Sequence, residues 1–207
     1  MDPGSAEATT LLTHLRRFGE LDERTFHQLL GLAEERTLPR HAFWSRPGEP
    51  VQHFAIVLEG LLRHYYVDAR GRESVKAFRG PNEFSAPYAE IILRRPSRTF
   101  VQALSPVRLL AFPVERFERL AHDSLELTRL ARRFVEMHFV GKEQREYEFL
   151  QLSAEDRYRQ FCAERPEHLK DIPQHQVASY IGITPVALSR IRSRLAKKGR
   201  TQKARTR

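Results

Sequence analysis

The sequence predicts an α+β protein with an N-terminal β-roll, a long helix and a C-terminal all-α helix-turn-helix domain. Residues 37–113 hold eight prolines, four glycines and many β-branched or aromatic residues, a composition typical of short strands between turns. The 52 residues between Pro113 and Pro166 contain no proline and only one glycine, which favours a long helix. Residues 172–195 follow with two short apolar patterns separated by Gly182, as in a helix-turn-helix.

Composition excludes several classes of protein. Cys162 is the only cysteine among 207 residues, so an intramolecular disulfide, a four-cysteine zinc site and a cysteine-ligated iron–sulfur cluster are impossible within one chain. No stretch approaches 18 uncharged apolar residues, so no membrane span is expected. The N-terminus lacks the basic-then-apolar pattern of a signal peptide. We therefore expect a cytoplasmic protein in a reducing environment with no membrane partner.

The N-terminal residues 6–34 predict two short helices. Leucines and phenylalanines recur through both at helical spacing, and Asp22 is a suitable N-cap for the second.

The roll is expected from five strands at residues 54–58, 62–67, 75–78, 99–104 and 108–112. Asp68–Gly71 forms a turn between the second and third of them, with Gly71 able to take a positive φ. Short strands at such intervals predict a small antiparallel barrel or roll.

The long helix carries an apolar seam at spacings of 3, 4, 3 and 4 residues, formed by Leu127, Leu130, Phe134, Met137 and Gly141. We interpret this seam as a dimer interface; the alternative is a helix packed on its own roll. A second apolar row at Val135, Phe139 and Phe149 indicates that one face points inward and one meets another subunit. The domains expected are a β-roll over 1–118, a dimerisation helix over 119–152 and a helix-turn-helix domain with a basic tail over 153–207.

Local signals place the helices of the C-terminal domain. Ser153 and Asp156 have the spacing of a capping box and predict a helix over 154–164. The first helix of the helix-turn-helix is expected over 174–180. Gly182 then supplies a left-handed turn residue, and Thr184 caps a helix that opens with Pro185.

Charge is concentrated in the same region. Residues 171–207 hold nine Lys/Arg and one Asp, a net charge of +8, whereas the first 170 residues hold 26 Lys/Arg and 25 Asp/Glu. A near-neutral body with a basic end is typical of a nucleic-acid-binding protein, although a solubilising tail would have the same charge.

Angular positions on the second helix divide it into two faces. One face is an apolar stripe that we expect to be buried, formed by Leu188, Ile191 and Leu195. The opposite face is basic and carries mostly short side chains, as a helix in the major groove requires. We expect Arg190 to hydrogen-bond guanine and Val186 to contact a thymine methyl group. The residues expected to contact double-stranded DNA are Gln174, His175, Thr184, Val186, Ser189, Arg190, Ser193, Arg194, Lys197 and Lys198.

The segments LSAEDRY at 152–158, GITP at 182–185 and LSRIR at 188–192 resemble the Crp/Fnr family of bacterial transcription regulators, and a Bacteroidetes-type subgroup in particular. The resemblance implies a cyclic-nucleotide-binding-like roll, a dimerising helix and a DNA-binding domain. It further implies a homodimer on a pseudo-palindromic operator, with RNA polymerase as a partner. Ser189-Arg190 matches the recognition helix of the family, but Val186 stands where the family has Glu, which implies a different operator.

Two departures from the family are visible. Only twelve basic and polar residues follow Leu195, so the usual β-hairpin wing is not expected, and an arm without fixed structure replaces it. The phosphate cassette is degraded, because Ala86 and Pro87 replace its Gly and Glu and Arg98 lies one residue out of register. The candidate ligand pocket consists of Phe84, Ser85, Ala86, Ser97, Arg98 and Thr99. We expect no cofactor and no bound cyclic nucleotide; the alternative is a regulator whose primary activity is sensing cyclic AMP or cyclic GMP.

An enzyme is not expected. The sequence holds no dinucleotide-binding or P-loop glycine pattern, no G-x-S-x-G and no H-E-x-x-H, so no catalytic residue is assigned. The histidines never lie three or four residues apart, so no helical metal pair is available and no metal site is expected. A haem held by Met137, His138 or Cys162 is the remaining alternative, but packing roles are favoured for all three.

Overall fold

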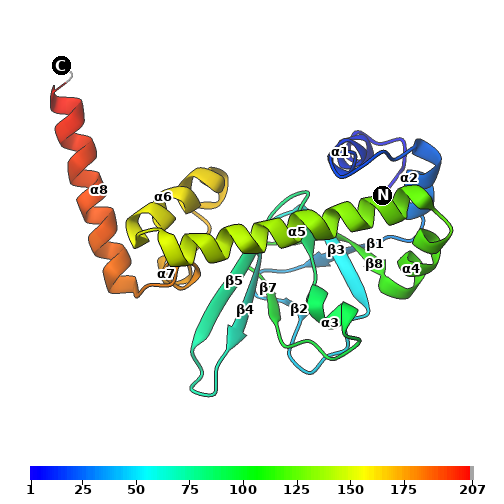
Figure 1. The fold of residues 1–207 in the computed structure, drawn as a ribbon, viewed down its shortest axis with the longest axis horizontal. Coiled ribbons are helices and arrows are strands. Elements are labelled where there is room, and N and C mark those ends of the chain that lie inside the picture. The colour runs from blue at the N-terminus through cyan, green and yellow to red at the C-terminus, as the bar shows by residue number, and fades with distance from the viewer. Residues whose placement is uncertain (206–207) are drawn as a thin grey trace. The chain divides into compact units, whose positions relative to one another are not determined.

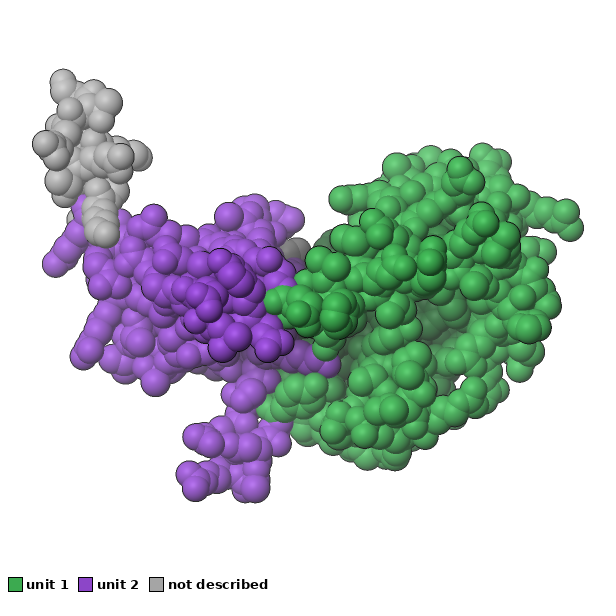
Figure 2. Space-filling view, viewed as in Figure 1, with its two compact units in different colours: residues 1–66, 77–143 green, residues 67–76, 144–207 purple. Residues whose placement is uncertain are grey.

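The computed structural model describes the backbone of residues 1–205, and their side chains except those of His168 and residues 198–205. The chain divides into two compact units, coloured separately in Figure 2. The first unit comprises residues 1–66 and 77–143, and the second comprises residues 67–76 and 144–207. No helix among the described residues is long and apolar enough to cross a membrane.

Eight strands form two four-stranded sheets (Figure 1). The first sheet has the order β1 (Glu34–Leu38), β8 (Val107–Pro113), β3 (His53–Glu59) and β6 (Phe84–Ser85). The second has the order β2 (Phe43–Ser45), β7 (Phe100–Ala103), β4 (Leu62–Val67) and β5 (Glu73–Arg79). The five strands that the sequence predicts are confirmed as β3, β4, β5, β7 and β8.

The sequence analysis missed the three other strands, which are short or polar. Four of the five residues of β1 are exposed, because this strand lies at the edge of its sheet and pairs only with β8. Without an apolar alternation, no periodicity marks it in the sequence.

The two sheets share one buried core. Ala55 and Val57 of β3 contribute to the same apolar cluster as Val101 and Ala103 of β7, so the sheets face each other as a sandwich. Alanines on both inner faces allow close packing of the sheets.

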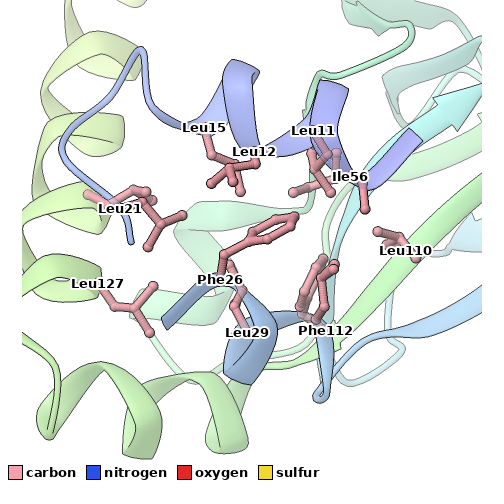
Figure 3. Close-up of a cluster of buried hydrophobic side chains, with 13 residues drawn as sticks. Leu11, Leu12, Leu15, Leu21, Phe26, Leu29, Ile56, Leu110, Phe112 and Leu127 are labelled. Carbon is pink, nitrogen blue, oxygen red and sulfur yellow. The ribbon is translucent and has the colours of Figure 1, made fainter. Parts of the chain in front are cut away.

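The outer face of the first sheet is covered by helices (Figure 3). Ile56, Leu110 and Phe112 alternate with the inward-facing residues of β3 and β8, as the period of two in a strand requires. The helices α1 (Ala6–Leu15) and α2 (Glu23–Leu30) pack on them and confirm the two predicted N-terminal helices. Asp22 caps α2 as expected, since its Oδ1 accepts from the amide of Thr25 at 2.6 Å.

Three further helices accompany the roll. A short α3 (Tyr88–Ile92) follows β6, and α4 (Val114–His122) follows β8. The long helix is α5 (Leu125–Gln151). The range 119–152 is thus not one helix, because α4 ends before Asp123 and α5 begins after Ser124.

The second unit contains α6 (Ala154–Glu164), a 3-10 turn (Pro166–His168), α7 (Gln174–Ile181) and α8 (Pro185–Arg205). Ser153 caps α6 as predicted, because its Oγ accepts from the amide of Asp156 at 3.2 Å.

Beyond Leu195, the prediction of an arm without fixed structure is wrong, because α8 continues to Arg205. Ala and Lys at 196–198 are strong helix formers and outweigh the single Gly199.

Candidate functional site

The turn between α7 and α8 has the geometry that its residues predict (Figure 1). Gly182 adopts the left-handed conformation with φ 75° and ψ 36°. Thr184 caps α8, since its Oγ1 accepts from the amide of Ala187 at 3.2 Å, and Pro185 is the first helical residue. The geometry of the turn between α7 and α8 is therefore determined by residues within the turn itself.

The two faces of α8 are also as predicted. Leu188 and Ile191 are buried against the second unit's core, and Leu195 is half-buried. Val186 is 62% exposed, so an apolar side chain is left in water on the opposite face. The other exposed residues of that face and its flanks are Thr184, Ser189, Arg190, Ser193, Arg194 and Lys197. Lys198 was also predicted as a contact, and its side chain lies outside the described residues.

The two arginines of this surface differ in their partners. The Nε of Arg194 lies 2.9 Å from Oε2 of Glu155 in α6, and Glu155 also pairs with Arg159. Arg190 makes no ion pair within the described part of the chain, so its guanidinium is available to a ligand. The sequence did not predict the partner of Arg194, because Glu155 lies far away in the chain.

The first turn of α7 adds two exposed polar residues, Gln174 and His175. Pro173 precedes them as the N-cap residue and makes no side-chain hydrogen bond to the amides of this turn.

Most of the predicted seam of α5 is covered by other residues of the same chain. Leu127 and Leu130 are buried in the core formed with α1 and α2. The ring centroids of Phe134 and Phe84 are 4.6 Å apart. Met137 and Gly141, by contrast, are exposed. The first three residues therefore pack on the chain's own N-terminal half. Heptad spacing shows that a face is apolar but not which partner covers it.

A different face of α5 remains exposed within the first unit. Val135 is 38% and Phe139 61% exposed. Val135 and Phe139 lie one turn apart and belong to the second apolar row that the sequence indicates.

The residues of the predicted ligand pocket divide into buried and exposed groups. Ser85, Ala86, Ser97 and Thr99 are buried, while Phe84 belongs to an aromatic cluster with Phe54 and Phe134. Ser97 and Thr99 hydrogen-bond each other through the Ser97 hydroxyl.

Arg98 points away from that interior and pairs with Glu90 of α3. Its side chain is 62% exposed, and its Nε lies 2.9 Å from Oε1 of Glu90. The Glu90 carboxylate is only 3% exposed and has Arg95 as a second partner at 3.6 Å. The only cation among the candidate pocket residues is thus already bound by a carboxylate of the same chain.

Sequence reasoning missed one polar group in the sandwich. Nε2 of His64 lies 2.8 Å from Oγ of Ser85, and both residues are buried. His64 lies two residues from Leu62 and therefore on the same, inner face of β4, and it pairs in register with Val101 of β7. The hydroxyl of Thr99, fully buried, has no hydrogen-bond partner in the described residues. The signal available in the sequence was His64 itself, a polar residue on the same strand face as Leu62.

The described residues contain no group of three or more His, Cys, Asp or Glu side chains that could hold a metal ion.

Residues 35–124 match the sequence profile of the cyclic nucleotide-binding domain. No curated protein matches the chain by sequence. Among solved structures, the chain is similar to the c-di-GMP responsive global regulator CLP of Xanthomonas campestris, with 17% identity, a TM-score of 0.67, and coverage of 86% of this chain and 93% of that one.

Two other structures are similar over comparable lengths. FixK2 from Bradyrhizobium japonicum is 20% identical with a TM-score of 0.68, and the match covers 81% of this chain and 86% of that one. The Thermus thermophilus catabolite activator protein is also 20% identical, with a TM-score of 0.56 and coverage of 90% and 88%. These similarities confirm the fold that the resemblance to Crp/Fnr regulators implied: a β-roll of the cyclic nucleotide-binding type, a long helix and C-terminal helices.

Proposed function

We propose that this protein is a sequence-specific DNA-binding transcription regulator that acts as a homodimer on a pseudo-palindromic operator and is not an enzyme. The observation that carries the proposal is the exposed face of α8, where Arg190 lacks an ion-pair partner in the described chain, beside short and apolar side chains. RNA polymerase is the partner implied for a regulator of this fold.

The chemistry of α8 suits the major groove. Arg190 can donate two hydrogen bonds to guanine, and Val186 can contact the methyl group of thymine. Ser189 and Ser193 are short enough to let the helix approach the base edges. Arg194 and Lys197 flank this face and would contact phosphates, which adds affinity but no sequence information.

The first turn of α7 is a second source of phosphate contacts. Gln174 and His175 are exposed there, at the positive end of the helix dipole. Contacts of this kind would position the helix-turn-helix on the duplex.

The exposed apolar row of α5 at Val135 and Phe139 is the dimer interface that we propose in place of the seam at Leu127–Phe134. Large apolar side chains side by side in water are typical of association surfaces. Two-fold pairing would present two recognition helices about 34 Å apart, one helical turn of DNA.

The ion pair between Arg98 and Glu90 supports a regulator without a bound cyclic nucleotide. A nucleotide phosphate would have to displace a carboxylate that is almost fully buried. The alternative, a cyclic-nucleotide-responsive regulator, requires Arg98 to turn inward toward Ser97 and Thr99.

Selection of bound duplexes from a random pool, followed by fluorescence polarisation, tests DNA binding. We expect a pseudo-palindromic site and an affinity that falls by roughly a thousandfold or more between about 50 and 200 mM salt. Arg190→Ala should cost about 1–3 kcal/mol, or roughly 5- to 150-fold, and relax the preference at one base pair per half-site. Arg24→Ala, which removes an exposed arginine of α2, is the matched control and should bind as the wild type does. An Arg190→Ala variant with unchanged affinity and preference would contradict the proposal.

Calorimetry with cyclic AMP and cyclic GMP tests the alternative. We expect no saturable heat from either nucleotide. Micromolar binding that disappears in Arg98→Ala would establish the alternative instead.

A further inference from the structure

Arg145, on the last turns of α5, binds the end of α7. Its Nη2 donates to the backbone carbonyl of Tyr180 at 2.7 Å. The same guanidinium lies 3.9 Å from the centroid of the Tyr180 ring and 4.8 Å from that of Phe149. One side chain therefore combines a charge-assisted hydrogen bond with two cation–π contacts.

Arg157, on α6, joins the C-terminal ends of two helices. Its Nε donates to the carbonyl of Ile181 at the end of α7, at 3.0 Å. Its Nη1 donates to the carbonyl of Leu152, directly after α5, at 2.7 Å. The last carbonyls of a helix lack partners within it and carry the negative end of its dipole, so a cation is favoured at both positions.

Phe149 lies between these arginines and the turn of the helix-turn-helix. A Cβ atom added at Gly182 would lie 2.5 Å from Cε1 of Phe149, so the turn rests directly on this ring. The guanidinium of Arg157 lies 5.0 Å from the centroid of the same ring. The turn that leads into α8 is thus bound on two sides to the last turns of α5.

We propose that Arg145 and Arg157 are positioning residues for the recognition helix. They set the direction of α7 and α8 relative to the C-terminal turns of α5, and their guanidinium groups are committed to backbone carbonyls rather than to DNA. The inference rests on the proposed function. In a dimer, the direction of each recognition helix determines which distance between half-sites both helices can reach at once.

The test is a comparison of duplexes in which two identical half-sites are moved apart or together one base pair at a time. Arg145→Met and Arg157→Met keep much of the side-chain bulk but remove the donors and the charge. Arg159→Met is the matched control, because Arg159 also lies on α6 but pairs only with the carboxylate of Glu155 in the described contacts. Binding of the full chain is measured by polarisation, and folding by circular dichroism.

The wild type and Arg159→Met should bind best at one spacing. Both test variants should lose about tenfold in affinity at that spacing, the effect of one charge-assisted hydrogen bond, and should bind neighbouring spacings almost equally well. Their affinity for a single half-site should stay within about twofold of the wild type, because the face of α8 is intact. Arg145→Lys, which keeps the charge but not the planar group, covers the case in which Arg145→Met does not fold and should give an intermediate profile.

A spacing profile that both test variants share with the wild type would overturn this inference alone. An equal loss on single half-sites would overturn it as well, because the arginines would then support the recognition face itself. A wild type that binds no duplex would instead contradict the proposed function, and with it the positioning role.

Discussion

Two arginines, one in each unit, have opposite surroundings. In the first unit, Arg108 lies among three carboxylates, those of Glu7, Glu35 and Glu59, with the last two at 3.2 and 3.5 Å. In the second unit, Arg190 has no such partner within the described chain. Paired charges in the roll serve the folded state, whereas an unpaired, exposed cation on a helix is available to a ligand.

The apolar residues of the two units differ in the same way. The first unit buries large side chains from two sheets and four helices, among them Phe26 and Phe112. The second unit has a smaller described core, including Phe161, Val177 and Leu188, and exposes Val186 on the face proposed for DNA. Substitutions of the buried residues in either unit should therefore act on stability, whereas substitutions of the exposed residues of α8 should act on binding.

The largest expected effect is that of Phe26→Ala, which should lower the free energy of unfolding by about 3–5 kcal/mol through the cavity it leaves. Phe139→Ala removes the same side chain from an exposed position of α5 and is the control. Urea unfolding measures both. We expect Phe139→Ala to leave the stability of the protomer nearly unchanged but to weaken dimerisation in sedimentation. Equal losses of stability in the two variants would contradict the distinction between a buried position and an exposed one.

Gly182→Ala should have the next largest effect, about 1–2 kcal/mol of destabilisation for the left-handed backbone alone, with more from the contact of the new Cβ with Phe149. Gly141→Ala is the matched control, since a Cβ there meets no atom within 4 Å and the residue is helical. It should stabilise the protein by about 1 kcal/mol. A loss of stability in Gly141→Ala would instead indicate that α5 associates through Gly141, as the original seam predicts.

The smallest expected effect concerns pH. Burial, followed by the charge of Arg17, lowers the pKa of His14 below its ordinary value of 6.5. Below pH 6.5 the unfolded chain binds a proton that the folded chain does not, so stability present above this pH is lost as the pH falls toward the folded pKa. Burial, followed by the charge of Arg36, lowers the pKa of His53 in the same direction.

We therefore expect the Tm of the wild type to fall between about pH 7.5 and 5.5, and to fall less in His14→Gln. His175→Gln, in the second unit, changes an exposed histidine and should follow the wild type. Parallel curves for all three proteins would show that His14 does not contribute.

Much of the segment from α7 to α8 was predictable because the rules that govern its turn are local. Gly182, Thr184 and Pro185 act on atoms within four residues, and Ser153 caps α6 in the same way. The alternation of inward-facing and outward-facing residues along each strand also follows from the backbone period, so the main strands of the roll were recognised.

The sequence by itself therefore predicted the main helices and strands and which face of α8 is basic. Only the tertiary structure decided the partners: α1 and α2 cover Leu127 and Leu130, Glu90 binds Arg98, and Arg145 binds the end of α7. Periodicity and capping depend on neighbours in the chain, whereas these contacts join residues that are brought together only when distant elements pack.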